Sequence, residues 1–185
     1  MDEPVDVLKE IVKNLTDLQI EYFLVGPIAT AQQKKSFTVT RNINIVLDRQ
    51  HTKIKDFLNR FVLDHYICPL FDVLYDDVKA QKPFTLYHEA SKVKVTFELR
   101  KESAIALSEF SRKTLLQVEP DFGVFVSTPE DVILKKLEFY CIAPSPQYIA
   151  DVRKLIYHNE VDQDYLDLWI DKLALSLAWG RASKN

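Results

Sequence analysis

Two asparagines, Asn42 and Asn44, stand two positions apart in a β-rich apolar run that continues to residue 47. Alternate side chains of a strand point to the same face of a sheet, so both amides are expected to face one cleft. A strand, a glycine turn, a helix and this second strand make the layout of a phosphate and metal site. Carboxylates at positions 42 and 44 would hold catalytic Mg²⁺ beside a nucleoside triphosphate. This chain has neutral amides there instead.

The turn before this strand is Gly26-Pro27, which follows an apolar run at residues 22–25. Glycine lets the backbone approach a phosphate closely, and amide hydrogens at a following helix start bind anions. Proline removes one such donor but is tolerated in a first helical turn. Residual phosphate binding and a simple strand-to-helix turn both fit this pattern. Arg41 is either a contact to a ligand in the same cleft or a surface or ion-pair residue.

Hydrophobic spacing predicts the elements that position these residues. Apolar residues recur at intervals of three and four in the helices, whereas β-branched and aromatic residues alternate in the strands. Thr128 followed by Pro129 is typical of a helix start. The predicted helices are residues 5–18, 50–61, 72–80, 129–142, 148–156 and 162–173, and the predicted strands are residues 22–25, 43–47, 66–67, 83–87, 93–99 and 124–127.

Composition indicates one compact unit with a helical C-terminal part. The chain has 185 residues, 47% of them hydrophobic, which is enough for a well-filled core. Cys68 and Cys141 form no metal-binding pair, so a reducing cytoplasm is the expected location. An acidic N-terminus and the lack of a long apolar stretch predict no membrane partner. A net charge of −3 does not indicate nucleic-acid binding.

The chain resembles the nucleotidyltransferase superfamily from residue 21 to about residue 179. It is most similar to small bacterial nucleotidyltransferase-like proteins, which are related to those of toxin–antitoxin and abortive-infection systems. Their pattern runs roughly LVGGxA, then HG, then RxTxDIDxV, and here Gly26, Ala29 and Thr40-Arg41 match it. Residues 127–137, STPEDVILKKL, match the SPEDLILxKL segment of the family.

The departures from the family pattern fall on its chemistry. Pro27 stands for the second glycine, Thr38 stands for the arginine, and the HG pair is missing from the sequence. Asn42 and Asn44 stand for the two metal-binding aspartates. An alignment without gaps places Thr96 at the third aspartate. Glu98, two residues further along and on the same face, is a possible substitute.

The resemblance implies an α/β (more strictly α+β) fold, with a mixed, mostly antiparallel sheet flanked by helices and followed by a C-terminal helical bundle. Residues 1–127 are expected to form the nucleotidyltransferase-like core, and residues 128–185 a helical region packed on it. Intact relatives are expected to join a nucleotide from a nucleoside triphosphate to a hydroxyl group with two Mg²⁺ ions.

Applied to this chain, the resemblance predicts a catalytically inactive protein without a bound metal or cofactor. Its cleft is expected to bind a nucleotide or a protein partner, with Gly26, Pro27, Thr40 and Arg41 as the nucleotide-binding residues. One alternative is an active Mg²⁺-dependent transferase that uses Glu98, helped by Asp48 or Glu89 from nearby. Another is a non-enzymatic regulatory module of a toxin–antitoxin-like pair.

Overall fold

The structure is a computed structural model that describes residues 3–26, 29, 39–49, 51–61, 66–67 and 69–183. Its strands are β1 (Tyr22–Val25), β2 (Asn42–Leu47), β3 (Tyr66–Ile67), β4 (Phe84–His88), β5 (Val93–Leu99), β6 (Thr114–Glu119) and β7 (Phe122–Val126). Within the described residues they form one sheet in the order β3-β4-β5-β2-β1-β7-β6. β2 runs parallel to β5 and β1 runs parallel to β7, while the other neighbours are antiparallel. This confirms the predicted mixed, mostly antiparallel sheet.

The two central strands have one apolar and one partly polar face, because buried residues alternate with more exposed ones along β2 and β5. Ile45 and Phe97 are register partners on the apolar face, and both are fully buried. Asn44 and Thr96 are register partners on the opposite face, where both are half-buried. The asparagine strand therefore has its polar side chains outside the core.

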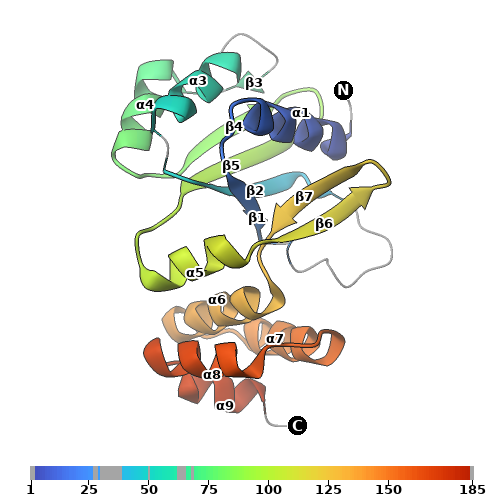
Figure 1. Cartoon of the computed structure of the whole chain (residues 1–185), viewed down its shortest axis with the longest axis vertical. Helices are drawn as coiled ribbons and strands as arrows, with labels where there is room; N and C mark the ends of the chain where they lie inside the picture. Colours follow the sequence, from blue (N-terminus) through green and yellow to red (C-terminus); the bar gives the residue numbers. More distant parts are fainter. Residues whose placement is uncertain are drawn as a thin grey trace.

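Three helices cover the apolar face: α1 (Pro4–Asp17), α3 (His51–Phe61) and α4 (Phe71–Lys79) (Figure 1). The helical spacing of the sequence places a buried stripe along α1. On α3, Phe57 packs edge-on against Phe97 of β5, with ring centroids 5.4 Å apart. These helices thus complete the hydrophobic core and leave the asparagine face to other elements.

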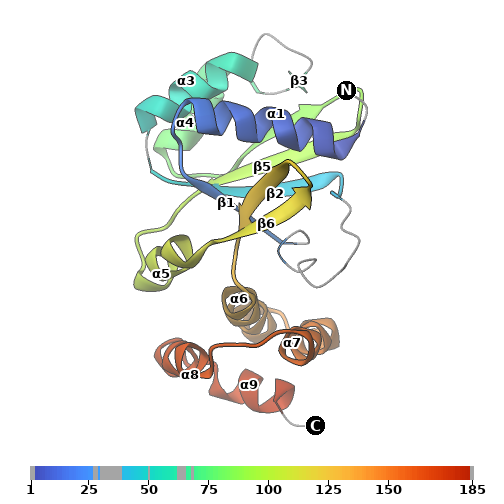
Figure 2. The same cartoon turned by 45° about the vertical axis from the view of Figure 1, so that its right-hand side comes forward.

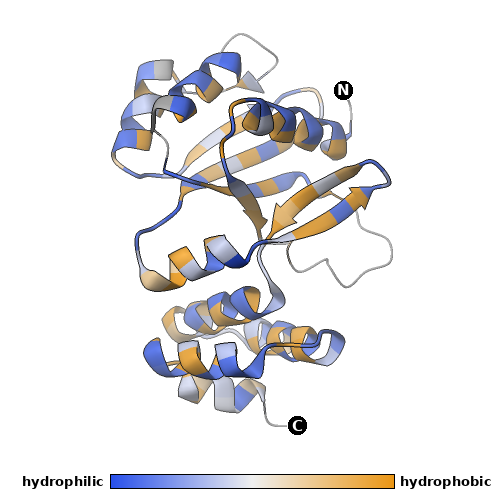
Figure 3. Cartoon of the chain, viewed as in Figure 1, coloured by the Kyte–Doolittle hydropathy of each residue, from blue (hydrophilic) through white to orange (hydrophobic). Residues whose placement is uncertain are grey.

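Between β5 and the C-terminal region lie α5 (Ala104–Arg112) and the β6–β7 hairpin. β6 is at the edge of the sheet, and hydrophobic residues run along both hairpin strands (Figure 3). The sequence did not predict β6, because its residues do not alternate strictly between buried and exposed positions.

The chain ends in α6 (Pro129–Ile142), α7 (Pro146–His158), α8 (Gln163–Lys172) and α9 (Ser176–Ala182), which pack together on the far side of α5 (Figure 2). The predicted start of α6 is confirmed, since the Thr128 side chain accepts a hydrogen bond from the backbone N–H of Asp131. α7 and α8 also begin with side-chain caps, from Ser145 and Asp162. Among the described residues, no helix combines the length and apolar character needed to cross a membrane.

Candidate functional site

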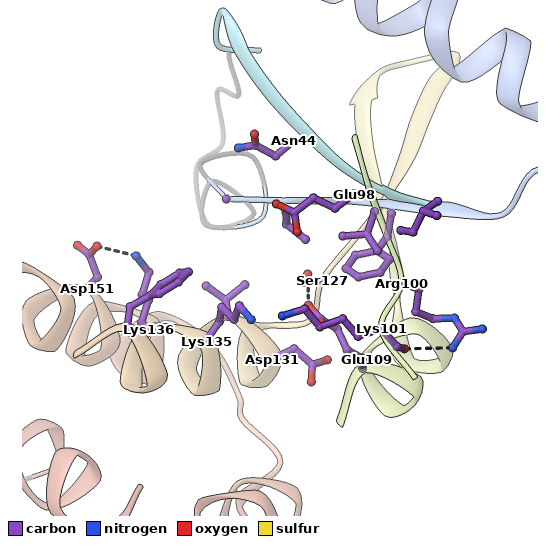
Figure 4. A pocket seen from close by; sticks show the side chains of 18 of the residues that line it. Asn44, Glu98, Arg100, Lys101, Glu109, Ser127, Asp131, Lys135, Lys136 and Asp151 are labelled. Carbon is purple, nitrogen blue, oxygen red and sulfur yellow. Dashed lines mark hydrogen bonds and ion pairs between the residues drawn. The ribbon is translucent and has the colours of Figure 1, made fainter. Parts of the chain in front are cut away.

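A cavity of about 610 Å³ lies between the polar face of the sheet and the helices α5, α6 and α7. It is lined from the sheet by β1, β2 and β5, and from the other side mainly by α6. In Figure 4, Asn44 and Glu98 lie on the sheet side, whereas Lys135 and Lys136 lie opposite them on α6. The volume is in the range of sites that bind small molecules and cofactors.

The sheet side of the cavity combines a glycine turn with an amide. Gly26 follows β1 and has a φ of +77°, a left-handed conformation that favours glycine. A Cβ atom added at Gly26 would lie 3.1 Å from Nδ2 of Asn44. The Gly26 backbone and the Asn44 amide therefore meet closely at the cavity wall, which Glu98 also lines.

The other predicted site residues in the described part of the chain lie outside this lining. Asn42 is exposed, and its backbone carbonyl accepts a hydrogen bond of 2.8 Å from the Thr40 hydroxyl. Arg41 is also exposed. The Thr96 hydroxyl lies 3.4 Å from that of Thr85 on β4. Pro27, and most of the segment expected to follow the turn, lie outside the described residues.

Lysines line the cavity from α6 and from the segment after β5. Lys136 donates a hydrogen bond of 2.7 Å to Asp151 of α7, so its charge is compensated locally. Lys135 lies 3.5 Å from Glu138 in a solvent-exposed pair. Lys101, just after β5, lines the same cavity and takes part in no ion pair within the described residues.

Glu109 of α5 is a half-buried carboxyl at the cavity wall. Its Oε1 atom accepts a hydrogen bond of 3.0 Å from the Ser127 hydroxyl. Burial raises the pKa of Glu109 to about 7, and the nearby charge of Asp131 acts in the same direction. This carboxyl is therefore poised to change its charge near neutral pH.

Asp131 also borders the cavity, but its oxygens are engaged in holding helices together. Its Oδ2 atom accepts a hydrogen bond of 2.7 Å from the Thr128 hydroxyl. Its Oδ1 atom accepts one of 2.7 Å from the Tyr165 hydroxyl of α8. Burial raises the pKa of Asp131. Next to it, Glu130 accepts hydrogen bonds from Arg112 of α5 and from the backbone N–H of Asp162. These buried acids join α5, α6 and α8.

No protein-family model matches this sequence, and no curated protein sequence matches it. Solved structures do match it over most of its length. An antigenic nucleotidyltransferase-like protein from Paracoccidioides brasiliensis aligns with 99% of this chain and 94% of its own, with a TM-score of 0.56 and 18% identity. The antibiotic-resistance factor ANT(2'')-Ia aligns with 94% of this chain and 92% of its own, with a TM-score of 0.56 and 9% identity. The fold is nucleotidyltransferase-like.

The nucleotidyltransferase-like fold confirms the predicted fold class. At these identities the likeness concerns the fold alone. The closer relation to bacterial toxin–antitoxin proteins stays a prediction.

The residues of this cleft do not fit the two-metal site that the resemblance implies for intact relatives. The described residues contain no group of three or more His, Cys, Asp or Glu side chains that could hold a metal ion. On the sheet side of the cavity, Glu98 is the one described carboxylate, beside the neutral Asn44. Asp48, considered as a helper, accepts hydrogen bonds of 2.9 and 3.1 Å from Arg100 and is absent from the described lining.

Sequence reasoning missed Lys101, Glu109 and Lys135 as members of the site. They come from separate segments and meet only because α5 and α6 pack opposite the sheet. Lys135 belongs to the 127–137 segment that matches the family pattern. That match was the available signal, and it did not show that Lys135 shares a cavity with Asn44.

Proposed function

We propose that this chain is a nucleotidyltransferase-fold protein that binds a nucleotide in the cleft between the sheet and α6, and that it does not transfer a nucleotidyl group. The observation that carries this proposal is the composition of the cleft. The turn at Gly26 is present, whereas the neighbouring position on β2 holds Asn44 instead of a carboxylate.

Three features of the cavity support a nucleotide as the ligand. The left-handed Gly26 has no side chain at the wall, so a phosphate can approach closely there. Lys101, after β5, and Lys135, on α6, supply positive charge. At the end formed by α6 and α7, Phe139 and Tyr148 lie with ring centroids 6.0 Å apart and give the cavity aromatic surface for a base, with the Lys135 ammonium 5.7 Å from the Phe139 centroid. The cleft thus offers contacts for both ends of a nucleotide.

The chain is expected not to transfer a nucleotidyl group because its cleft has too few carboxylates to hold two metal ions. Two-metal catalysis needs carboxylates that hold both ions against the triphosphate. An amide contributes one neutral oxygen, and a threonine hydroxyl contributes no charge. With Asn44, Thr96 and the single carboxylate of Glu98, the polar face of the central strands cannot supply the required negative charge.

An active transferase that uses Glu98 is the second candidate. The observation that favours it is the position of Glu98 on the cavity wall, without an ion pair in the described part of the chain. The two candidates differ in the fate of the nucleotide. An inactive protein returns the nucleoside triphosphate unchanged, whereas an active one releases pyrophosphate and leaves a labelled acceptor.

Two measurements on the full chain test the proposed function. Calorimetric titration with ATP, GTP, CTP and UTP in excess MgCl₂ should give saturable binding of at least one of them, and Lys101→Ala should weaken it. Lys55→Ala is the matched control, because Lys55 is an exposed lysine on α3 across the sheet.

Incubation with α-³²P-labelled nucleotides, the protein and bulk RNA should yield no labelled product. Labelled product that disappears in Glu98→Ala would establish the second candidate.

A further inference from the structure

The charges that line the cavity divide into those that are already compensated and those that remain available. Arg100 is paired with Asp48, and Lys136 is paired with Asp151. The Asp131 carboxylate is held by two hydroxyl donors. None of these groups is free to bind a ligand without losing a partner inside the protein.

The available charges are few. Glu98 and Glu109 are the remaining acids, and Lys101 and Lys135 are the remaining bases in the described lining. The pair between Lys135 and Glu138 is exposed and contributes little, so it does not fix the ammonium group. Because burial raises the pKa of Glu109 to about 7, that carboxyl carries only part of a negative charge at neutral pH. The available groups are thus two lysines and two carboxyls, one of which, Glu109, is held partly protonated by burial.

Asn44 changes the chemistry of the wall next to Gly26. A carboxylate there would repel a phosphate unless a cation lay between them. The Asn44 amide has two N–H donors and can turn them directly toward a phosphate oxygen. Asparagine at position 44, where the family pattern has aspartate, thus removes a metal ligand and adds a hydrogen-bond donor for an anion.

We propose that the cleft binds the triphosphate of its nucleotide without a divalent cation, with Lys101 and Lys135 as the counter-ions and the Asn44 amide as a hydrogen-bond donor. This inference rests on the proposed function, because it concerns the same ligand in the same cleft. Lysine is a suitable counter-ion here, since its ammonium is a compact charge on a flexible stem and reaches phosphate oxygens from several directions.

The test is a titration of ATP, or of whichever nucleotide binds best, into the full chain in excess EDTA and again in excess MgCl₂. The wild-type Kd should agree within about threefold between the two buffers. Lys101→Ala/Lys135→Ala should raise Kd in EDTA by on the order of tenfold or more, because two charge-assisted contacts are lost. Lys55→Ala should leave Kd unchanged. Both cavity lysines are exposed, so thermal melting should show a native fold in the double variant.

Asn44→Asp should make nucleotide binding depend on MgCl₂, unlike binding by wild type. The new carboxylate should weaken binding in EDTA by roughly tenfold, and MgCl₂ should restore part of the affinity by placing a cation between carboxylate and phosphate. Wild-type binding that occurs only with MgCl₂ would overturn the inference and leave the proposed function standing. Binding in EDTA that the lysine double variant retains would remove the counter-ion role. A failure of every nucleotide to bind in either buffer would instead reject the proposed function.

Discussion

Asn44 on β2 and Thr96 on β5 are direct neighbours in the sheet, as register partners of two parallel strands. Their side chains lie on the face opposite the main core, and Asn44 reaches the cavity wall. The resemblance places metal-binding aspartates at both positions. The neighbouring pair is thus neutral in this chain, which leaves Glu98 as the one described carboxylate on the sheet side of the cavity.

Restoring carboxylates at this neighbouring pair should create a cation site. Wild-type protein is expected to show no saturable Mg²⁺ binding in calorimetry without nucleotide, because hard cations need several charged oxygen ligands. Asn44→Asp/Thr96→Asp adds two carboxylates beside Glu98 and should bind Mg²⁺ with a measurable heat. Asn44→Ala/Thr96→Ala is the matched control. Equal Mg²⁺ binding by wild type and the aspartate variant would contradict the account of the sheet side.

Gly26→Ala should destabilise the protein. The φ of +77° costs a residue with a Cβ atom about 1 to 2 kcal/mol, and the added methyl group would press on Asn44. Gly180→Ala is the matched control, since a Cβ atom there meets nothing within 4 Å and the position lies in α9. That control should raise the free energy of unfolding by about 0.5 kcal/mol. Urea unfolding of both variants measures the difference, and equal stability would argue against a left-handed Gly26.

Tyr165→Phe should loosen the junction between α6 and α8. The Tyr165 hydroxyl donates to the buried Asp131 over 2.7 Å, and its loss leaves a carboxylate oxygen without this donor. The expected cost is about 1 to 3 kcal/mol in the free energy of unfolding. Tyr157→Phe, at a ring that is 84% exposed, should change stability very little. Similar effects of the two substitutions would mean that the Asp131 bond is not formed in solution.

The pKa of Glu109 predicts a pH-dependent stability difference. Burial raises this pKa to about 7 in the folded chain, so the folded state binds more protons than the unfolded state between the two pKa values. Stability from this group is fully present below the unfolded pKa and is lost as pH rises through about 7. Glu109→Gln removes this pH-dependent loss of stability. The free energy of unfolding of the variant should exceed that of wild type by on the order of 2 kcal/mol near pH ~8, and the two should be nearly equal near pH ~4.

The comparison with Glu109→Gln isolates this one carboxyl from its neighbours. Asp131, Lys135 and Glu138 act electrostatically on Glu109 and are present in both proteins. Urea unfolding at a series of pH values gives the difference curve. A gain that is the same at every pH would show that Glu109 titrates normally in the folded chain.

Much of the fold follows from local patterns in the sequence. The β5 alternation predicts residues 93–99, where the structure has Val93–Leu99, and Thr128 with Pro129 predicts the start of α6. These signals are local, because a cap or an alternating strand is specified by residues close in sequence. β6 was missed, since an edge strand buries no regular face. α5 and α9 are short and were also missed.

The site was predicted only in part, for a different reason. Gly26, Asn44 and Glu98 were found because strand periodicity and the family pattern point to one face of the sheet. Lys101 and Glu109 join them through the packing of α5 and α6, which no local pattern encodes. Conversely, Asn42 and Arg41 share the motif but lie outside the described cavity lining.

A crystal structure of the wild-type chain grown with ATP and excess MnCl₂ would show whether this cleft holds a nucleotide without a metal pair, because anomalous scattering locates manganese. We predict a triphosphate between Gly26 and Lys101, with no anomalous peak between its oxygens and Glu98. A manganese ion bound there by Glu98 and the triphosphate would contradict the account.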